Sequence, residues 1–320
     1  NIEISMVIKK QPNTKEFKQG DKKHIGNLPN GYTKLVCANF QNWQYEDLPD
    51  NVVKTVKYFI LDTIGVIAGA ANAPGIYKLN KRLTSWEKDG PSTALIGKWK
   101  ASPPTVALAN GAAAHALDFD DMHDPARVHA YCVNLPAVLA AAETQPNIDG
   151  KNFVAALATG VEFHGRLGLT CPNSLGRGWH PTMVLGLPSA ALAVGRILKL
   201  KDEKLVNSLA IAYHQTSGSR QPMFDGDLCK RIGAGFAARS AVLAGFLALD
   251  GISGPVHAFE GEAGYFHMYE RDDVIPEILS ENIGDKWEIL NYSMKPFPCC
   301  RCTHNFITIG LELNKEGLDI

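Results

Sequence analysis

Acidic and imidazole side chains are concentrated in one short stretch of the chain, residues 109–143, between two alanine-rich segments. His115 is followed by the block Asp118-Phe119-Asp120-Asp121, and then by His123 and His129. So many titratable groups are unusual in a hydrophobic core, and they are typical of sites that transfer protons. This stretch is the first candidate for an active site.

Helical spacing predicts how these side chains are distributed. If the helix before the block continued through it, His115, Asp118 and Met122 would share one face, and Asp120 and Asp121 would point elsewhere. Asp118 could then shift the pKa of a neighbouring imidazole or take part in proton transfer. For Asp120 and Asp121 a role in a turn or at a helix end is favoured, because clustered aspartates commonly begin or end helices.

Two further segments could bind an anionic substrate. His180 lies in a glycine-flanked loop before a helix that is predicted to begin near Thr182, and free backbone N–H groups gather at such helix starts. Lys230 and Arg231 precede another helix and could hold a carboxylate as a point charge and as a fork. A structural histidine and a solvated basic pair are the alternatives from the residues alone.

Three motifs suggest other ligands but fit them poorly. Residues 233–238 match a dinucleotide fingerprint, yet the preceding residues are too charged for the buried strand that this fingerprint requires. Residues 299–304 contain three cysteines and a histidine, but the chain has no second pair for a structural zinc site, so we expect a buried cysteine cluster. An Asp/His site for a divalent metal at 118–129 is the weaker alternative. We therefore predict no metal and no cofactor.

Composition limits the class of protein. The chain has 320 residues, 45% of them hydrophobic, which suffices for a large core in one or two domains. Its 32 basic and 33 acidic residues nearly cancel, which does not favour nucleic acid or a membrane as a partner. Seven cysteines without a disulfide-like spacing are typical of a cytoplasmic protein. The start lacks a signal-peptide pattern, and the best apolar run, 232–249, is interrupted by Arg239 before it reaches the ~18 residues of a membrane span.

Apolar periodicity predicts a mainly α-helical protein. Residues 1–26 are rich in lysine and are predicted to be a flexible tail, 27–280 an all-α domain, and 281–320 the incomplete start of a smaller α+β domain. A strand is expected within 286–297. Small residues on many of the predicted helices let their axes approach closely, which favours a multi-helix bundle. The predicted helices are Asn51–Ala68, Thr105–Leu117, Val133–Glu143, Asn152–Leu169, Val184–Leu198, Asp202–Ser217, Ile232–Leu249 and Cys302–Glu316.

Several of these motifs, taken in order, carry a family resemblance that extends from about Leu48 to Leu313. They are Asn110-Gly111, His115, Asp118–Asp121, Trp179-His180-Pro181, Asp225–Arg239 and Lys295–Cys299. Together they resemble the MmgE/PrpD family, whose members include 2-methylcitrate dehydratase, cis-aconitate decarboxylase and iminodisuccinate epimerase. The resemblance implies a large helical domain, a smaller α+β lid domain with the pocket between them, and a homodimer. Chains of this family continue beyond the length of this one, so the sequence resembles a truncated member.

The resemblance also implies roles for individual residues. Catalytic roles fall on Asp118, His129, His180 and Lys230, and substrate-binding roles on Arg231, Met122 and His123. The implied reaction is a metal-independent elimination on a small di- or tricarboxylate such as 2-methylcitrate, in which Lys230 stabilises enolate-like charge. The alternatives are an epimerase of an iminodisuccinate-like compound, a decarboxylase of a cis-aconitate-like compound, and a carboxylate-binding scaffold without turnover. The decarboxylase branch has a threonine at the position of Met122 and a shorter spacing to the histidine, which disfavours decarboxylation.

Overall fold

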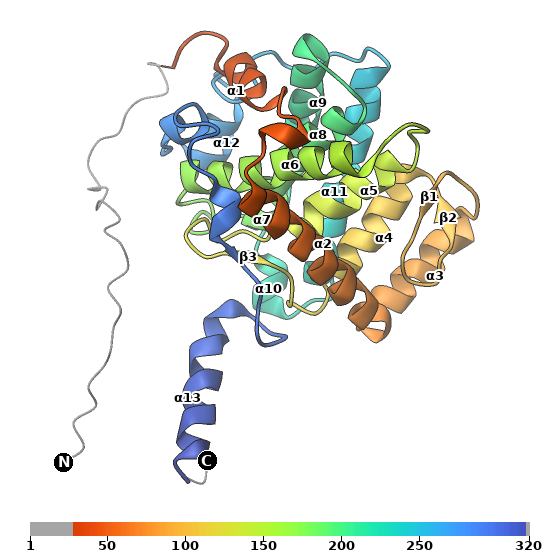
Figure 1. Cartoon of the computed structure of the whole chain (residues 1–320), viewed down its shortest axis with the longest axis vertical. Coiled ribbons are helices and arrows are strands. Elements are labelled where there is room, and N and C mark those ends of the chain that lie inside the picture. The colour runs from red at the N-terminus through yellow and green to blue at the C-terminus, as the bar shows by residue number, and fades with distance from the viewer. Residues whose placement is uncertain (1–27, 318–320) are drawn as a thin grey trace, which may run out of the picture.

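The structure is a computed structural model that describes residues 28–317. The tail predicted at 1–26 lies outside the described residues. The protein is mainly α-helical, as predicted, and its helices gather in one body from which the last helix projects (Figure 1). The helices are α1 (Tyr32–Phe40), α2 (Asp50–Gly69), α3 (Ile76–Trp86), α4 (Pro103–His115), α5 (Tyr131–Ala142), α6 (Gly150–Thr170), α7 (Pro181–Val184), α8 (Gly186–Ile197), α9 (Asp202–His214), α10 (Gln221–Asp225), α11 (Cys229–Leu249), α12 (Tyr265–Glu270) and α13 (His304–Lys315). The short strands are β1 (Ser92–Thr93), β2 (Lys100–Ala101), β3 (Met122–His123) and β4 (Tyr292–Ser293).

Helices α4 and α11 pack against each other at the centre of the body, and α5, α8 and α9 surround α11. Close approach of α4 and α11 depends on glycine. A Cβ added to Gly235 would lie 2.4 Å from the carbonyl oxygen of Leu108, and one added to Gly111 would lie 2.9 Å from the Cα of Gly235. Because these glycines lie inside helices that touch backbone to backbone, the dinucleotide-like motif at 233–238 serves helix packing.

Helix α11 also bears on the membrane prediction. By length and composition it is apolar enough to cross a bilayer, although Arg239 lies within it as noted from the sequence. However, 61% of its most apolar window is buried inside the protein, as in the core helix of a helical bundle. Its Gly233 and Gly245 also lie against neighbouring helices, near Met183 of α7 and Val194 of α8.

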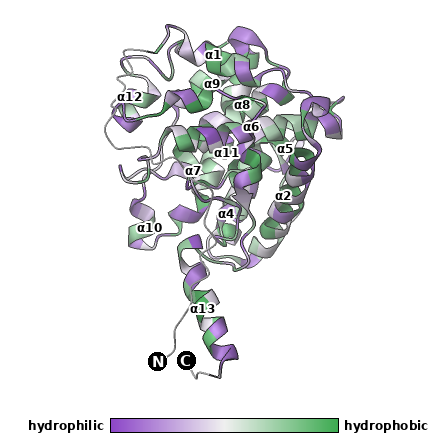
Figure 2. Cartoon of the chain, turned by 60° about the vertical axis from the view of Figure 1, so that its left-hand side comes forward, coloured by the Kyte–Doolittle hydropathy of each residue, from purple (hydrophilic) through white to green (hydrophobic). Residues whose placement is uncertain are grey.

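The strand predicted within 286–297 is largely replaced by other structure. Residues 288–291 form a short 3₁₀ helix, and only Tyr292 and Ser293 form strand β4, which pairs antiparallel with β3 in the register Met122 with Ser293. The helix predicted at Cys302–Glu316 is confirmed as α13. Helix α13 mixes hydrophobic and hydrophilic residues along its length (Figure 2), and its Phe306 is 74% exposed. The division at residue 280 stays a prediction.

Candidate active site

The turn after α4 sets the geometry of the acidic block. Helix α4 ends at His115, and Asp118 has a left-handed backbone with φ of 53°. Aspartate tolerates this conformation better than most residues. Because the helix does not continue, the prediction that His115, Asp118 and Met122 share a helical face is wrong. The turn instead brings the carboxylate of Asp120 back to the ring of His115, with a distance of 2.7 Å between Nδ1 and Oδ2.

Two ammonium groups converge on Asp118. The Nζ of Lys230, at the start of α11, lies 3.4 Å from Oδ2 of Asp118. The Nζ of Lys295 donates to the carbonyl oxygen of Asp118 at 2.6 Å, lies 3.2 Å from its Oδ1, and lies 3.9 Å from Oδ1 of Asp120. Burial alone would raise the pKa of Asp118, but the two ammonium groups outweigh it and lower the pKa to about 2. Asp118 is therefore a carboxylate at neutral pH.

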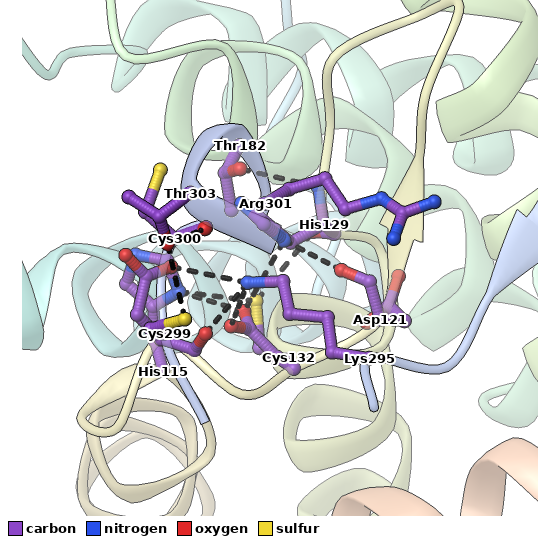
Figure 3. A network of polar contacts seen from close by, with 12 residues as sticks. His115, Asp121, His129, Cys132, Thr182, Lys295, Cys299, Cys300, Arg301 and Thr303 are labelled. Carbon is purple, nitrogen blue, oxygen red and sulfur yellow. Dashed lines mark hydrogen bonds and ion pairs between the residues drawn. The ribbon is translucent and has the colours of Figure 1, made fainter. Parts of the chain in front are cut away.

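Lys295 is the residue that sequence analysis missed as a site residue. Its side chain is fully buried, and Figure 3 shows it extending toward the group that contains His115 and Cys132. A lysine is almost never fully buried without a charged partner. The available signal was the Lys295–Cys299 motif, which contributed to the family resemblance, but no local pattern placed this lysine beside an aspartate 177 positions earlier.

Three imidazoles lie along the same cluster. The ring of His115 is 5.4 Å from that of His129 and 5.6 Å from that of His180, centroid to centroid. Nδ1 of His129 donates to the carbonyl oxygen of Asp121 at 2.5 Å, which leaves its Nε2 free to accept a proton. Burial lowers the pKa of His129 to about 4, although Asp120 opposes this shift, and burial also lowers the pKa of His180 well below its usual value. Both rings are therefore neutral at neutral pH.

The neighbouring acids Asp120 and Asp121 have opposite environments. Asp121 accepts hydrogen bonds from the backbone N–H groups of Ala130 and Tyr131, at 2.7 and 2.9 Å, where α5 begins, so it serves a helix end as predicted. Burial and the charge of Asp120 raise its pKa well above the usual value. The turn role predicted for Asp120 is wrong, because its buried carboxylate faces imidazoles and Lys295. Burial opposes ionisation of Asp120, but His129 and His115 outweigh it and lower the pKa well below the usual value.

The three residues predicted to bind substrate have different surroundings in the structure. Arg231 lies beside the cluster, where its Nη1 donates to the carbonyl oxygen of Ala116 at 2.6 Å. His123 is buried, with Nε2 3.2 Å from Glu288 and Nδ1 accepting from the N–H of Ala126, and its contact with substrate stays a prediction. Met122 lies in β3, and its carbonyl oxygen accepts a hydrogen bond from Ser293.

Two groups in the cluster have the composition of metal sites: His115, Asp120 and Cys132, and Asp118, Asp120 and His129. The ammonium of Lys295 already faces both carboxylates, and the pKa of the Cys132 thiol is raised well above its usual value, chiefly by burial. A thiol and a competing ammonium do not fit a divalent cation. The cysteines at 299–302 are also not the buried cluster we predicted, because Cys300 and Cys302 are exposed.

Comparison with known proteins places the chain in a family. A sequence model described as the MmgE/PrpD N-terminal domain matches residues 37–277. The chain belongs to the MmgE/PrpD family. The match covers every helix from α2 to α12, including the start of α11 with Lys230, and the loops that carry the acidic block and His180. Lys295 and α13 follow the matched region.

Several curated relatives carry the name cis-aconitate decarboxylase. The chain is 30% identical over 295 residues to a cis-aconitate decarboxylase of Aspergillus terreus, an alignment that covers 87% of this chain and 59% of the relative. It is 32% identical over 275 residues to the cis-aconitate decarboxylase of Homo sapiens, covering 80% of this chain and 54% of the relative. The chain thus spans somewhat more than half the length of these curated relatives.

Proposed function

We propose that this family member is a lyase of small polycarboxylates, and that decarboxylation of a cis-aconitate-like tricarboxylate is its reaction. The observation that carries the proposal is the convergence of Lys230 and Lys295 on Asp118, next to two neutral imidazoles. The relatives' names favour decarboxylation over the 2-methylcitrate dehydration that the sequence suggested first. The methionine at position 122, where the decarboxylase branch has threonine, is an argument against decarboxylation. We give it less weight than the similarity along most of the chain.

The reaction defines what the site must supply. In cis-aconitate, the bond between the CH₂ group and its carboxylate breaks, and CO₂ leaves. The electron pair forms a new double bond to the central carbon, and the old double bond shifts onto the vinyl carbon next to the other terminal carboxylate. A proton added to that carbon completes an itaconate-type product. The site must therefore bind three carboxylates, stabilise enolate-like charge and deliver one proton.

The cationic side chains suit the first two tasks. Lys230 is partly exposed, at 17% of its side chain, and faces Asp118, whose side chain is 30% exposed, so an incoming carboxylate can reach its ammonium. Lys295 supplies a second ammonium that is fully buried, where charge interacts more strongly than in water. Arg231 lies beside them at the end of α4. We assign carboxylate binding and stabilisation of the developing charge to these three residues.

His129 and His180 suit proton delivery. Both imidazoles are neutral without substrate because burial lowers their pKa values. A bound tricarboxylate adds negative charge beside them, which raises the pKa of an imidazole and favours its protonated form. Substrate binding would thus create the acid that the reaction needs. His115, held by Asp120 at 2.7 Å, has its ring within 5.6 Å of both rings, centroid to centroid, and can relay a proton.

The full chain incubated in D₂O with cis-aconitate, 2-methylcitrate or an iminodisuccinate analogue tests this proposal. We expect release of CO₂ from cis-aconitate and one solvent deuteron in the new CH₂ group of the product, measured by mass spectrometry. An alkene formed from 2-methylcitrate without CO₂ release would replace decarboxylation by dehydration. Deuterium incorporation with inversion would indicate an epimerase. Tight binding without turnover or exchange would contradict an enzyme and support a carboxylate-binding scaffold.

A further inference from the structure

A second buried charge pair lies away from the acidic block, on helix α6. Arg166 is 3% exposed, and its Nε donates to Oε1 of Glu162, one turn earlier, at 2.7 Å. Its two Nη atoms donate to four backbone carbonyl oxygens outside the helix, those of Ile278 at 2.8 Å, Glu281 at 3.1 Å, Asn282 at 3.1 Å and Lys286 at 2.5 Å. All five N–H donors of a guanidinium are thereby used.

Side-chain contacts also hold the segment of residues 278–289 at two further points. The other carboxylate oxygen of Glu162 accepts the backbone N–H of Ile289 at 2.9 Å. The side chain of Glu288 then meets Nε2 of His123 in β3, at 3.2 Å. Residues 278–289 are therefore fixed to α6 on one side and to the strand after the acidic block on the other.

This segment has little regular structure of its own. It contains parts of two short 3₁₀ helices and one isolated bridge, between Ile283 and Lys286, and leads into the two-residue strand β4. A two-residue pairing is too short to fix a strand by itself. Lys295 follows β4 by two residues, and its ammonium must reach both oxygen atoms of Asp118 that it contacts. The position of Lys295 thus depends on what holds residues 278–289.

We propose that Arg166 is a positioning residue, which holds residues 278–289 on α6 and so places the ammonium of Lys295 against Asp118. The effect on turnover rests on the proposed function, whereas the position of Lys295 does not. Lysine cannot replace Arg166, because an ammonium has three donors and no planar fork that reaches four carbonyl groups at once.

Chemical labelling tests the position of Lys295 without any turnover. The folded protein is acetylated with a limiting amount of an activated ester, and peptide mass spectrometry follows Lys295, with Lys151 (62% exposed) as the internal reference. In the unchanged protein we expect Lys295 to be protected. In Arg166→Lys its labelling relative to Lys151 should rise about tenfold, because the segment opens locally. A folded Arg166→Lys protein with Lys295 as protected as before would overturn the proposal.

A matched control separates positioning from general loosening. Ser208→Ala removes a buried hydrogen bond to the carbonyl oxygen of Ala191, between α8 and α9, far along the chain from the segment. The two variants are labelled at temperatures equally far below their unfolding temperatures. Under these conditions Ser208→Ala should leave Lys295 protected, whereas Arg166→Lys should not. Equal labelling in both variants would show a general effect and overturn the proposal.

Kinetics provide the second readout. If Arg166 acts through Lys295, the loss of kcat/KM caused by Arg166→Lys should shrink to less than about twofold in a Lys295→Met background. An equal loss in both backgrounds would overturn the proposal. If the protein shows no turnover at all, the proposed function fails and the labelling result still decides the role of Arg166.

Should Arg166→Lys not fold, Glu288→Ala loosens the tie to His123 instead. The expected result is the same increase in Lys295 labelling, smaller in size. Unchanged protection in a folded Glu288→Ala protein would contradict placement of Lys295 by this segment.

Discussion

Two clusters of buried charge differ in how completely their atoms are paired. At Glu162 and Arg166, both carboxylate oxygens and every guanidinium donor meet a protein partner at hydrogen-bond distance. Around Asp118, Lys295 donates to Asp118 at 2.6 and 3.2 Å, but Lys230 lies 3.4 Å from that carboxylate, and Oδ1 of Asp120 has no hydrogen-bond partner in the described part of the chain. A fully satisfied network fixes structure, whereas a charge cluster with spare capacity can exchange partners with a ligand.

Unpaired polar atoms alone do not define the site. The carboxylate oxygens of Glu270 are buried without a hydrogen-bond partner in the described part of the chain, and Nε of Arg177 lies 3.5 Å from one of them. Around Asp118, in contrast, cations and imidazoles from five separate segments meet. The convergence of several reactive types, rather than incomplete pairing, distinguishes the candidate site.

The largest expected effect concerns the fully paired cluster of Glu162 and Arg166. Glu162→Ala leaves the guanidinium of Arg166 buried without its counterion and removes the acceptor of the Ile289 N–H group. Removing one partner of a buried ion pair should lower the free energy of unfolding by about 3–5 kcal/mol. Urea denaturation measures it. The exposed pair of Glu46 with Lys151 is the control, and Glu46→Ala should leave the unfolding midpoint unchanged. Similar midpoints for both variants would contradict the structural role.

The matching change in the candidate site should affect turnover and spare the fold. Lys230→Ala removes a partly exposed ammonium that we assign to the developing negative charge. We expect kcat/KM to fall by about 10²–10³-fold, the typical loss for one electrostatic group, with the unfolding midpoint nearly unchanged. Steady-state assays with cis-aconitate measure it, and the exposed Lys151→Ala serves as the control. Full activity of Lys230→Ala would remove this residue from the mechanism.

Most of the helical body could be predicted from the sequence. Apolar periodicity alone located α2, α6 and α11 within three residues at either end, because core-facing positions repeat along a helix. The prediction of a strand at 286–297 was largely wrong because long-range contacts determine the structure there. Its aromatic residues suit a strand, but its neighbouring backbone carbonyls are bound by Arg166, which lies 120 residues earlier. Local pattern carries no information on such a partner.

Only part of the candidate site could be predicted from the sequence, because several of its contacts also join residues that are far apart in the chain. Helix starts and glycine-flanked loops marked His180 and Lys230, which are local features. Asp120 was assigned to a turn because its pairing with His115 depends on where α4 ends, and Asp118 has a left-handed backbone that periodicity does not anticipate. Lys295 required a long-range contact. The resemblance gave His123 a role in substrate binding, and no local pattern indicated that its ring contacts Glu288, 165 positions later.

Asp121 should behave as part of the scaffold although it adjoins Asp120. Asp121→Ala leaves the backbone N–H groups of Ala130 and Tyr131 without their acceptors at the start of α5. Unpaired buried N–H groups should lower the free energy of unfolding by about 1–3 kcal/mol. Asp121→Asn keeps one acceptor oxygen and should recover part of this loss. Urea denaturation of both variants measures the effect, and equal stability of Asp121→Ala and the unchanged protein would contradict the helix-end role.

Glu270 gives the smallest expected effect and sharpens the contrast, because its buried carboxylate, with only a 3.5 Å ion pair to Arg177, should cost stability. Burial, only partly offset by Ser174 and Arg177, raises its pKa in the folded protein to about 7. In the unfolded chain a glutamate titrates near ~4.3. Between these values the unfolded state has lost a proton that the folded state keeps, so stability falls as the pH rises through this window. Glu270→Gln removes this dependence. It should be about 1–2 kcal/mol more stable than the unchanged protein at pH 8 and nearly equal at pH 4.5, measured by urea denaturation at both values. A Glu270→Gln protein that is less stable at pH 8 would mean that the ion pair with Arg177 outweighs burial, and that this cluster belongs with Glu162 and Arg166.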